Sequence, residues 1–541
     1  MQTADLLLVN GRFLTMEDAQ PTAEAVAIRA GKLLYVGTAD GAKAYADEKT
    51  DVIDLQGHVA APAFLECHTH PSDYAKVLSL LNCRGENTAS PEKLLACIRR
   101  KAAETPKGEW IVASGYDEGS FRDGPVPVTN EFLDRAAPEH PLVISRICGH
   151  ICALNSMAMR VGGIDEAFLQ EHPGCTGFRD ENGRLNGQFS SNVKGFLPIP
   201  AVTVAQLEEG FMQVQETYFK NGITTSADMS VKQDFLGMLE KLDLQKQLKL
   251  RIGFYHSANA KSVAVSRPKA AATLGMRTGF GSEKLRFLGF KYFLDGSMGG
   301  KTAAISVPYL GEPENFGRFE NNQEQLNESV LLALNAGVQT AIHAIGDRAI
   351  EMALKAYEYA KENGADFRAL RCRVEHLEIP TEDHIRRIRE LELAVGLSSA
   401  FIYSLGDSHI TAIGQERLTH AFPAKTLMDR GIPVACNCDC PVCEVNPLLG
   451  IYAMVTRTTV RGQSFGGNAE SIDRHRALEA YTKNAAYLLW CDDVLGTLKA
   501  GKNADIVVFE DDYLNVPDEE LKNVRVRMTM QNGEIVYRKN N

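Results

Sequence analysis

Short apolar runs alternate, through the middle of the chain, with stretches in which apolar residues recur every three or four positions. The first pattern is typical of buried strands and the second of amphipathic helices. Strands that alternate with helices favour parallel βα units, and eight such units predict an α/β fold with a TIM-type (β/α)8 barrel. The eight predicted strands cover residues 61–70, 222–228, 250–256, 285–294, 338–343, 371–377, 393–399 and 432–438.

The two ends of the chain have a different pattern, in which short strands are separated by turn residues. Asn10-Gly11 and Asn532-Gly533 each lie between two apolar runs. Asn-Gly in this setting predicts a β-hairpin. We expect the two ends to close on each other as one small β-sandwich, built from residues 1–58 and 491–541.

Residues 59–490 then form the barrel, with one long interruption. The gap from about 72 to 205 is too long for a single βα connection. It also contains a strand of its own, Pro141 to Ser145, and many turns. We therefore expect an inserted subdomain after the first barrel strand.

Composition excludes several classes of partner. The chain has 541 residues, a formal net charge of −11 and twelve cysteines. The negative charge argues against a nucleic acid or an anionic membrane as partner, and no apolar run reaches the length of a membrane span. The N-terminus lacks the basic start and apolar core of a signal peptide, so the scattered cysteines are interpreted as reduced thiols in a cytoplasmic protein.

Candidate chemistry begins where the first predicted barrel strand ends, at His68 and His70. Side chains two positions apart on a strand point the same way, so the two imidazoles are expected side by side. Such a pair is half of a site for a zinc-class cation. Two nearby histidines are also common as buried structural residues, so the interpretation depends on ligands from other strands.

Later strands supply further polar residues at the same end, where the active site of a TIM-type barrel lies. Each could by itself be a hydrogen-bonded core residue, but their occurrence at matching strand ends favours a hydrolytic site with one or two metal ions. These residues are Lys291, His343, His376 and Asp439.

Lys291 decides between one and two metals. A protonated lysine has no lone pair for a metal, but burial lowers its pKa and exposes the free amine. Carbon dioxide can then add to the amine and form a carbamate, whose two oxygens can bridge two cations. The alternative is an ion pair between Lys291 and Asp295, four residues further along the chain.

Cysteines crowd the end of the eighth predicted strand, at positions 436, 438, 440 and 443. A thiolate metal cluster is one interpretation. Their alternate spacing in a strand that ends in Asp439 favours the other, in which small apolar thiols pack the top of the barrel.

The combination of motifs resembles the amidohydrolase superfamily, and within it the YtcJ-like subgroup that includes N-substituted formamide deformylase. The similarity extends over nearly the whole chain. Its motifs are His68-Thr69-His70, the segments 291–297 and 343–349, Val374-Glu375-His376, the segment 439–442, Gly149-His150 with Asn155, and the segment 495–505.

The resemblance implies a role for each candidate residue. His68 and His70 would bind one zinc-class ion, with Asp439 completing its shell, and His343 and His376 would bind a second. Carboxylated Lys291 would bridge the two ions, which zinc, manganese, iron or cobalt could provide. Asp439 would take the proton of the attacking water, and His150 would help to hold the developing oxyanion. His150 could instead be a surface or packing residue.

We therefore expect a metal-dependent hydrolase that cleaves a C–N bond outside peptide chains, with an amide of a small molecule as substrate. One alternative is a single-metal deaminase of an amidine or a heterocycle, with ligands His68, His70, His343 and Asp439. Another is a metal-binding regulator without catalysis. The resemblance also implies a homodimer.

Overall fold

The computed structural model describes residues 2–83, 88–116, 118, 121, 126–146, 151–259 and 265–539. The chain divides into two compact units. One comprises Met1–Ser72 together with Val214–Asn541, and the other comprises Asp73–Gln213. No helix in the described part of the chain combines the length and the apolar character that a membrane span needs.

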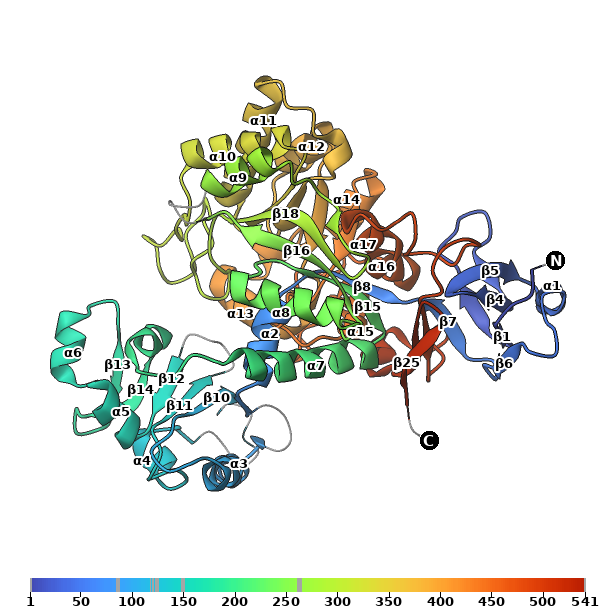
Figure 1. Ribbon diagram of the computed structural model, residues 1–541. Helices are drawn as coiled ribbons and strands as arrows, with labels where there is room; N and C mark the ends of the chain where they lie inside the picture. The colour runs from blue at the N-terminus through green and yellow to red at the C-terminus, as the bar shows by residue number, and fades with distance from the viewer. Residues whose placement is uncertain are drawn as a thin grey trace. The chain divides into compact units, whose positions relative to one another are not determined.

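Eight parallel strands form the central sheet of the first unit, and the prediction of a TIM-type barrel is confirmed (Figure 1). In this sheet each barrel strand pairs with the next barrel strand along the chain. The short antiparallel strand β17 (Phe280–Gly281) also pairs with β18. In spatial order the strands are β8 (Phe64–Thr69), β15 (Ile223–Asp228), β16 (Arg251–Ser257), β18 (Leu285–Phe293), β19 (Gln339–Ala344), β20 (Arg373–His376), β21 (Ala394–Leu397) and β22 (Val434–Cys436).

The first and last strands meet and bring the two ends of this sheet together. The His70 amide donates to the Cys440 carbonyl at 2.7 Å, and the Asp439 amide donates to the His68 carbonyl at 3.2 Å. These bonds lie at the carboxyl ends of β8 and β22, which is the end where the candidate ligands were predicted.

Amphipathic helices cover the outside of the strands. In α11 the buried residues Ile350, Ala353, Tyr357 and Ala360 recur at helical spacing, and the Tyr357 hydroxyl lies 2.9 Å from the Thr340 hydroxyl of β19. Besides α1 (Ala39–Lys43) at the N-terminal end, the α-helices that lie wholly within this unit are α8 (Gln233–Leu244), α9 (Ser266–Leu274), α10 (Gln323–Asn335), α11 (Asp347–Glu362), α12 (Glu382–Glu390), α13 (Ala400–Ile413), α14 (Ala424–Asp429), α15 (Pro447–Thr456), α16 (Arg474–Tyr481) and α17 (Lys483–Leu488).

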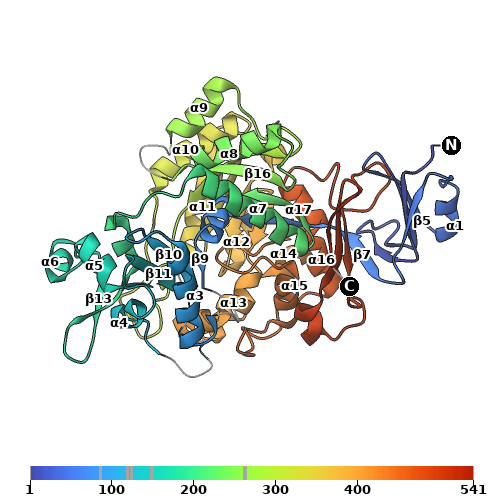
Figure 2. The same ribbon diagram turned by 60° about the horizontal axis from the view of Figure 1, so that its bottom comes forward.

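Strands from both chain ends form two further sheets on one side of the barrel, blue and red in Figures 1 and 2. Their shared core includes Leu8, Val26, Ile506 and Met530. One sheet has the order β5 (Lys32–Gly37), β4 (Ala25–Arg29), β1 (Leu6–Val9), β6 (Asp51–Asp54). The other has the order β25 (Glu534–Arg538), β24 (Val526–Gln531), β23 (Ile506–Phe509), β7 (Val59–Pro62), β2 (Arg12–Leu14), β3 (Thr22–Ala23).

One of the two predicted Asn-Gly hairpins is wrong. Asn532-Gly533 does connect the antiparallel pair β24 and β25. At Asn10-Gly11, however, β1 pairs with β4 and β6, whereas β2 belongs to the other sheet and pairs with β3 and β7. Asn10 has a φ of 53° and turns the chain from one sheet into the other. The sandwich core, not the local turn, decides which strands pair.

The second unit has a mixed sheet of its own. Helices α3 (Pro91–Glu104) and α4 (Asn130–Asp134) begin at the hydroxyl caps Ser90 and Thr129. The sheet order is β13 (Gly177–Arg179), β14 (Leu185–Ser190), β12 (Ile151–Leu154), β11 (Leu142–Arg146), β10 (Ile111–Tyr116), β9 (Leu81–Asn82). Its other helices are α5 (Ser156–Gly162) and α6 (Glu166–Glu171). The chain passes from one unit to the other within α2 (Pro71–Leu78) and again within α7 (Val204–Lys220).

A buried ion pair links the barrel to the sandwich within the first unit. Arg251 at the start of β16 donates to Asp505 just before β23, with Nη1 and Oδ2 2.6 Å apart. The two side chains are 4% and 5% exposed. The Asn532 amide also donates to Asp505 at 2.9 Å, so this carboxylate receives donors from two segments besides its own.

Asp505→Ala is expected to lower the free energy of unfolding by about 3–5 kcal/mol, because it removes the buried counter-ion of Arg251 and leaves only the exposed Glu283, 3.3 Å away. Urea unfolding of the full chain measures this change. Glu139→Ala is the matched control, since it removes an exposed ion pair with Lys107, 2.8 Å long, and should cost less than about 1 kcal/mol. Equal losses in the two variants would contradict a stabilising role of the buried pair.

Candidate metal centre

His68, His70 and Asp439 form a compact cluster at the carboxyl ends of β8 and β22. Asp439 Oδ1 lies 3.2 Å from His70 Nε2 and 3.5 Å from His68 Nε2. One potential ligand atom of each residue lies within 4.8 Å of the others. In the part of the chain that the structure describes, no other group of three or more His, Cys, Asp or Glu side chains is arranged in this way.

His68 and His70 lie close to each other at the end of β8. Their ring centroids are 5.8 Å apart. However, the register between β8 and β15 shifts twice, between Ile223 and Thr225 and again between Ser226 and Asp228. The pairing of β8 is therefore not fully regular near the two histidines.

The other predicted ligands lie beside this cluster. Lys291 is fully buried, and its Nζ lies 2.9 Å from His68 Nε2. The ring of His376 lies between those of His68 and His343, with centroid distances of 4.8 Å and 4.4 Å. The structure thus brings His68, His70, Lys291 and Asp439 together, with His376 and His343 following in a row. His150 lies outside the described residues.

Hydrogen bonds from the neighbouring strand fix the protonation of His376. The Ser398 hydroxyl donates to Asn437 Oδ1 at 2.9 Å, so it can only accept from His376 Nδ1, 2.7 Å away. The proton of the neutral ring is therefore on Nδ1. His376 Nε2 is buried, has no hydrogen-bond partner among the described residues, and presents its lone pair.

The pKa shifts of the buried groups favour protonation states that suit metal binding. Burial, followed by the nearby His343, lowers the pKa of His376 well below its ordinary value, so the ring is neutral. Burial alone would raise the pKa of Asp439, but the surrounding His68, His70 and Lys291 lower it, so the side chain is a carboxylate. Burial lowers the pKa of Lys291 to about 8 and makes a free amine accessible near neutral pH.

These donor atoms fit a divalent cation. Neutral imidazole nitrogens and a carboxylate oxygen are ligands of zinc and similar metals. Asp439 Oδ1 is buried without a hydrogen-bond partner among the described residues, because the geometry of its approach to His70 is not that of a hydrogen bond. Buried polar atoms without partners are costly, and bound cations would satisfy this oxygen and His376 Nε2.

The alternative pairing of Lys291 with Asp295 does not occur. The Asp295 carboxylate instead accepts backbone N–H groups from Ala304, Ile345 and Gly346 at 2.8–3.1 Å. His343 Nε2 also lies 3.2 Å from Asp295. Asp295 therefore holds the loop after β19 in place, which leaves Lys291 directed at His68.

The cysteines near β22 do not form a thiolate cluster with the candidate ligands. Cys436 and Cys438 are fully buried. Burial raises the pKa of Cys436 to about 12 and that of Cys438 well above its ordinary value, so both thiols are protonated. The interpretation as small apolar packing residues agrees with this environment.

Sequence reasoning missed the residues that orient the ligands. Ser398 and Asn437 hold His376, and Glu375, together with Arg373, contacts His68 from inside the barrel. The signal was present, because Arg373 and Glu375 are charged residues at alternate positions of a predicted buried strand. Their partner on a strand about three hundred residues away could not be identified from spacing.

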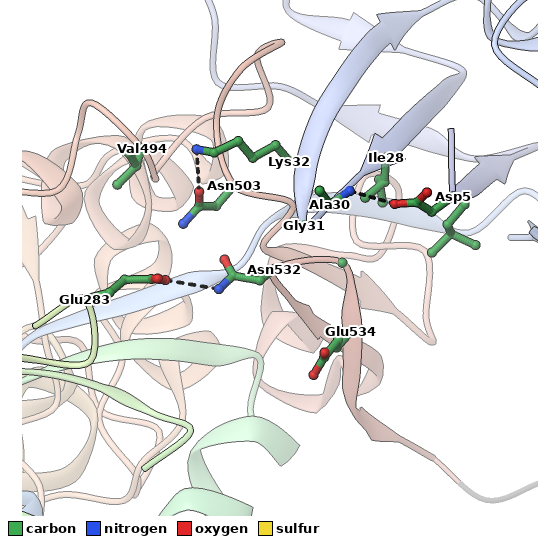
Figure 3. A pocket seen from close by; sticks show the side chains of 12 residues that line it. Asp5, Ile28, Ala30, Gly31, Lys32, Glu283, Val494, Asn503, Asn532 and Glu534 are labelled. Atoms are coloured by element: carbon green, nitrogen blue, oxygen red, sulfur yellow. Dashed lines mark hydrogen bonds between the residues drawn. The ribbon is translucent and has the colours of Figure 1, made fainter. Parts of the chain in front are cut away.

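A cavity of about 650 Å³ lies elsewhere, between the sandwich and the barrel (Figure 3). Asp5, Lys32, Glu283 and Asn532 are among its lining residues, and none of the predicted site residues lines it. Glu283 precedes β18, so the cavity lies at the amino ends of the barrel strands. Active sites of this fold lie at the opposite end.

Comparison with known proteins agrees with the motifs. The model of a family described as the amidohydrolase family matches residues 51–537. The chain belongs to the amidohydrolase family. The resemblance inferred from the motifs is thereby confirmed, as is the prediction of a hydrolase.

Individual relatives cover nearly the whole chain. The putative amidohydrolase YtcJ of Bacillus subtilis is 26% identical over 98% of both chains. The N-substituted formamide deformylase of Arthrobacter pascens is 23% identical over 99% of both chains. The crystal structure of an uncharacterized metal-dependent hydrolase from Pyrococcus furiosus matches with a TM-score of 0.74 and 25% identity, over 94% of this chain and 100% of that one.

Single substitutions in the cluster and beside it should distinguish residues that bind a metal from residues that only lie nearby. His70→Ala is expected to bind much less zinc than the unaltered protein, because one of the three candidate ligand atoms is removed. Cys438→Ala, next to Asp439, should keep the zinc content of the unaltered protein, since a protonated buried thiol does not bind metal. Elemental analysis of the proteins purified without chelator measures both. Loss of zinc in Cys438→Ala would restore the thiolate interpretation.

Proposed function

We propose that this amidohydrolase cleaves the C–N bond of a small-molecule amide outside peptide chains, such as an N-substituted formamide or another N-acyl compound. The cluster of His68, His70 and Asp439 with Lys291 at the carboxyl end of the barrel carries the proposal. The name of the Arthrobacter pascens relative points to the same class of substrate.

The donor set suits two cations. His68, His70 and Asp439 would hold the first, and His343 and His376 the second. A carbamate on Lys291 would join them through its two oxygens. Zinc fits these nitrogen and oxygen donors, and manganese, iron or cobalt could occupy the same positions. When bound, such a cation is a Lewis acid that activates water and polarises a carbonyl group.

The protein's own groups then handle protons and orientation. Asp439 is ionised and can accept the proton of the attacking water and pass it to the leaving nitrogen. Ser398 keeps the His376 ring in one orientation by accepting its Nδ1 proton. His150 lies outside the described residues and stays our candidate for stabilising the oxyanion, together with the cation that polarises the carbonyl group.

A single-metal deaminase is the second candidate, because only three ligand atoms lie in one compact group among the described residues. In that case Lys291 would remain an amine, with its Nζ beside His68 Nε2, 2.9 Å away in this structure. The substrate would be an amidine or a heterocycle. The number of metal ions per chain and the class of substrate distinguish the two candidates.

The first test compares the unaltered protein with Asp439→Asn on a panel of N-substituted formamides, other N-acyl compounds, amidines and heterocycles. We expect amide turnover, with kcat lower in the variant by a factor of about 10²–10⁴ because the proton acceptor is lost. Metal content should fall much less, since the amide oxygen can still be a ligand. Turnover of amidines or heterocycles alone would favour the deaminase.

A second test asks whether Lys291 holds two metal ions together. Lys291→Ala is expected to lower the metal content from about two ions per chain to about one, because the carbamate of Lys291 would hold both. Most activity should be lost with it. A short carboxylic acid, added with carbon dioxide, should partly restore both quantities. The control is His256→Ala, which changes a half-buried residue of β16 outside the cluster and should keep the metal content. Full activity of Lys291→Ala would contradict the bridging role.

A further inference from the structure

An ion pair lies inside the barrel, next to the candidate metal centre. Arg373 and Glu375 are alternate residues of β20, and both are fully buried. The guanidinium group contacts both carboxylate oxygens, through Nε to Oε1 and through Nη2 to Oε2, the latter at 3.0 Å. Buried ion pairs of this kind can often be replaced by apolar side chains without loss of stability. Stability therefore does not explain the pair, and its other contacts indicate what it does.

Glu375 makes such a contact with a predicted ligand. Its Oε2 is hydrogen-bonded to His68 Nδ1 across the barrel. A carboxylate paired with a guanidinium group can only accept, so the proton is on Nδ1 of His68. Nε2 then presents its lone pair on the side of Lys291 and Asp439, 2.9 Å and 3.5 Å away.

The surroundings hold the pair in this position. Arg373 Nη2 also donates to the carbonyl of Cys67, the residue before His68, at 2.7 Å. On the neighbouring strand β21, Gly396 leaves room for it, because a Cβ there would lie 2.2 Å from Glu375 Oε2. Both the carboxylate and the strand that carries His68 are therefore fixed by the same guanidinium group.

Glu378 is a second buried carboxylate, located just after β20, and its histidine partner is not a predicted metal ligand. It is 1% exposed and pairs with His409 at 3.0 Å between Oε2 and Nε2. His409 belongs to α13 and is not part of the cluster. The two glutamates share burial and a histidine partner, but only Glu375 contacts a predicted ligand.

We propose that Glu375 is a positioning residue of the metal centre. It selects the tautomer of His68 that leaves Nε2 free for a cation, and Arg373 holds Glu375 in the orientation that does so. This inference rests on the proposed metal-dependent function. It concerns how the protein's own residues prepare one ligand, and it does not depend on the identity of the substrate.

Glu375→Gln tests the inference without changing the size of the side chain. Both carboxylate oxygens accept from Arg373, so in either orientation of the glutamine its NH2 group faces an Arg373 donor. The side chain is displaced, and His68 loses the fixed acceptor of its Nδ1 proton. We expect the affinity for zinc, measured by competition with a chromogenic chelator, to fall about 10- to 100-fold. The absorption spectrum of the cobalt-loaded protein should change as well. In Glu375→Gln/Arg373→Met the amide oxygen can turn to His68, and most of the zinc affinity should return.

Two further variants separate this effect from a general loss of stability. Glu378→Gln removes a comparable buried carboxylate and should lower the thermal midpoint of the metal-free protein without weakening zinc binding. Gly396→Ala crowds Glu375 but keeps its charge, and should weaken zinc binding even where Glu375→Gln does not fold.

Unchanged zinc affinity in Glu375→Gln and Gly396→Ala, or equal weakening in Glu378→Gln, would overturn the inference. Failure of the unaltered protein to bind zinc, manganese, iron or cobalt would overturn it together with the metal centre. Zinc binding with the expected dependence on Glu375, but no turnover of any amide, would support the inference and contradict the proposed function alone.

Discussion

Two backbone hydrogen bonds between the ends of β8 and β22 are the contact on which the candidate site depends. They join His68 and His70 to Cys440 and Asp439. A closed ring of parallel strands lets residues about 370 positions apart share one group of ligand atoms, within 4.8 Å of one another. Lys291, His376 and His343 then come from intermediate strands, because all parallel strands present their carboxyl ends on the same side.

Closure alone would leave charged and polar groups buried without partners, which is costly. The barrel interior meets this requirement through paired groups. Arg373 and Glu375 neutralise each other, Ser398 joins His376 to Asn437, and Asp295 accepts three backbone N–H groups. After these pairings, His376 Nε2 and Asp439 Oδ1 are among the buried atoms that have no hydrogen-bond partner within the described residues. Both carry lone pairs that a cation could accept, and the family of the chain is consistent with that use.

The two outcomes at the Asn-Gly turns illustrate the limit of local prediction. The same dipeptide closes a hairpin between β24 and β25 but moves the chain between sheets after β1. The difference lies in the partners available. β2 pairs with β7, which in turn pairs with β23 from the other end of the chain. A turn residue fixes where the chain bends, whereas burial of two apolar faces decides which strands become neighbours.

The sequence by itself determined the eight βα units, the family and the residue types of the candidate ligands, because hydrophobic periodicity and motif chemistry are local properties of the chain. It also indicated that Lys291 differs from an ordinary surface lysine. Only the tertiary structure decided that Lys291 faces His68 and not Asp295, and that the cysteines near β22 are protonated packing residues. It also decided that Glu375 reaches His68 across the barrel. Each of these depends on which side chains meet from distant strands, and spacing along the chain carries no information about such contacts.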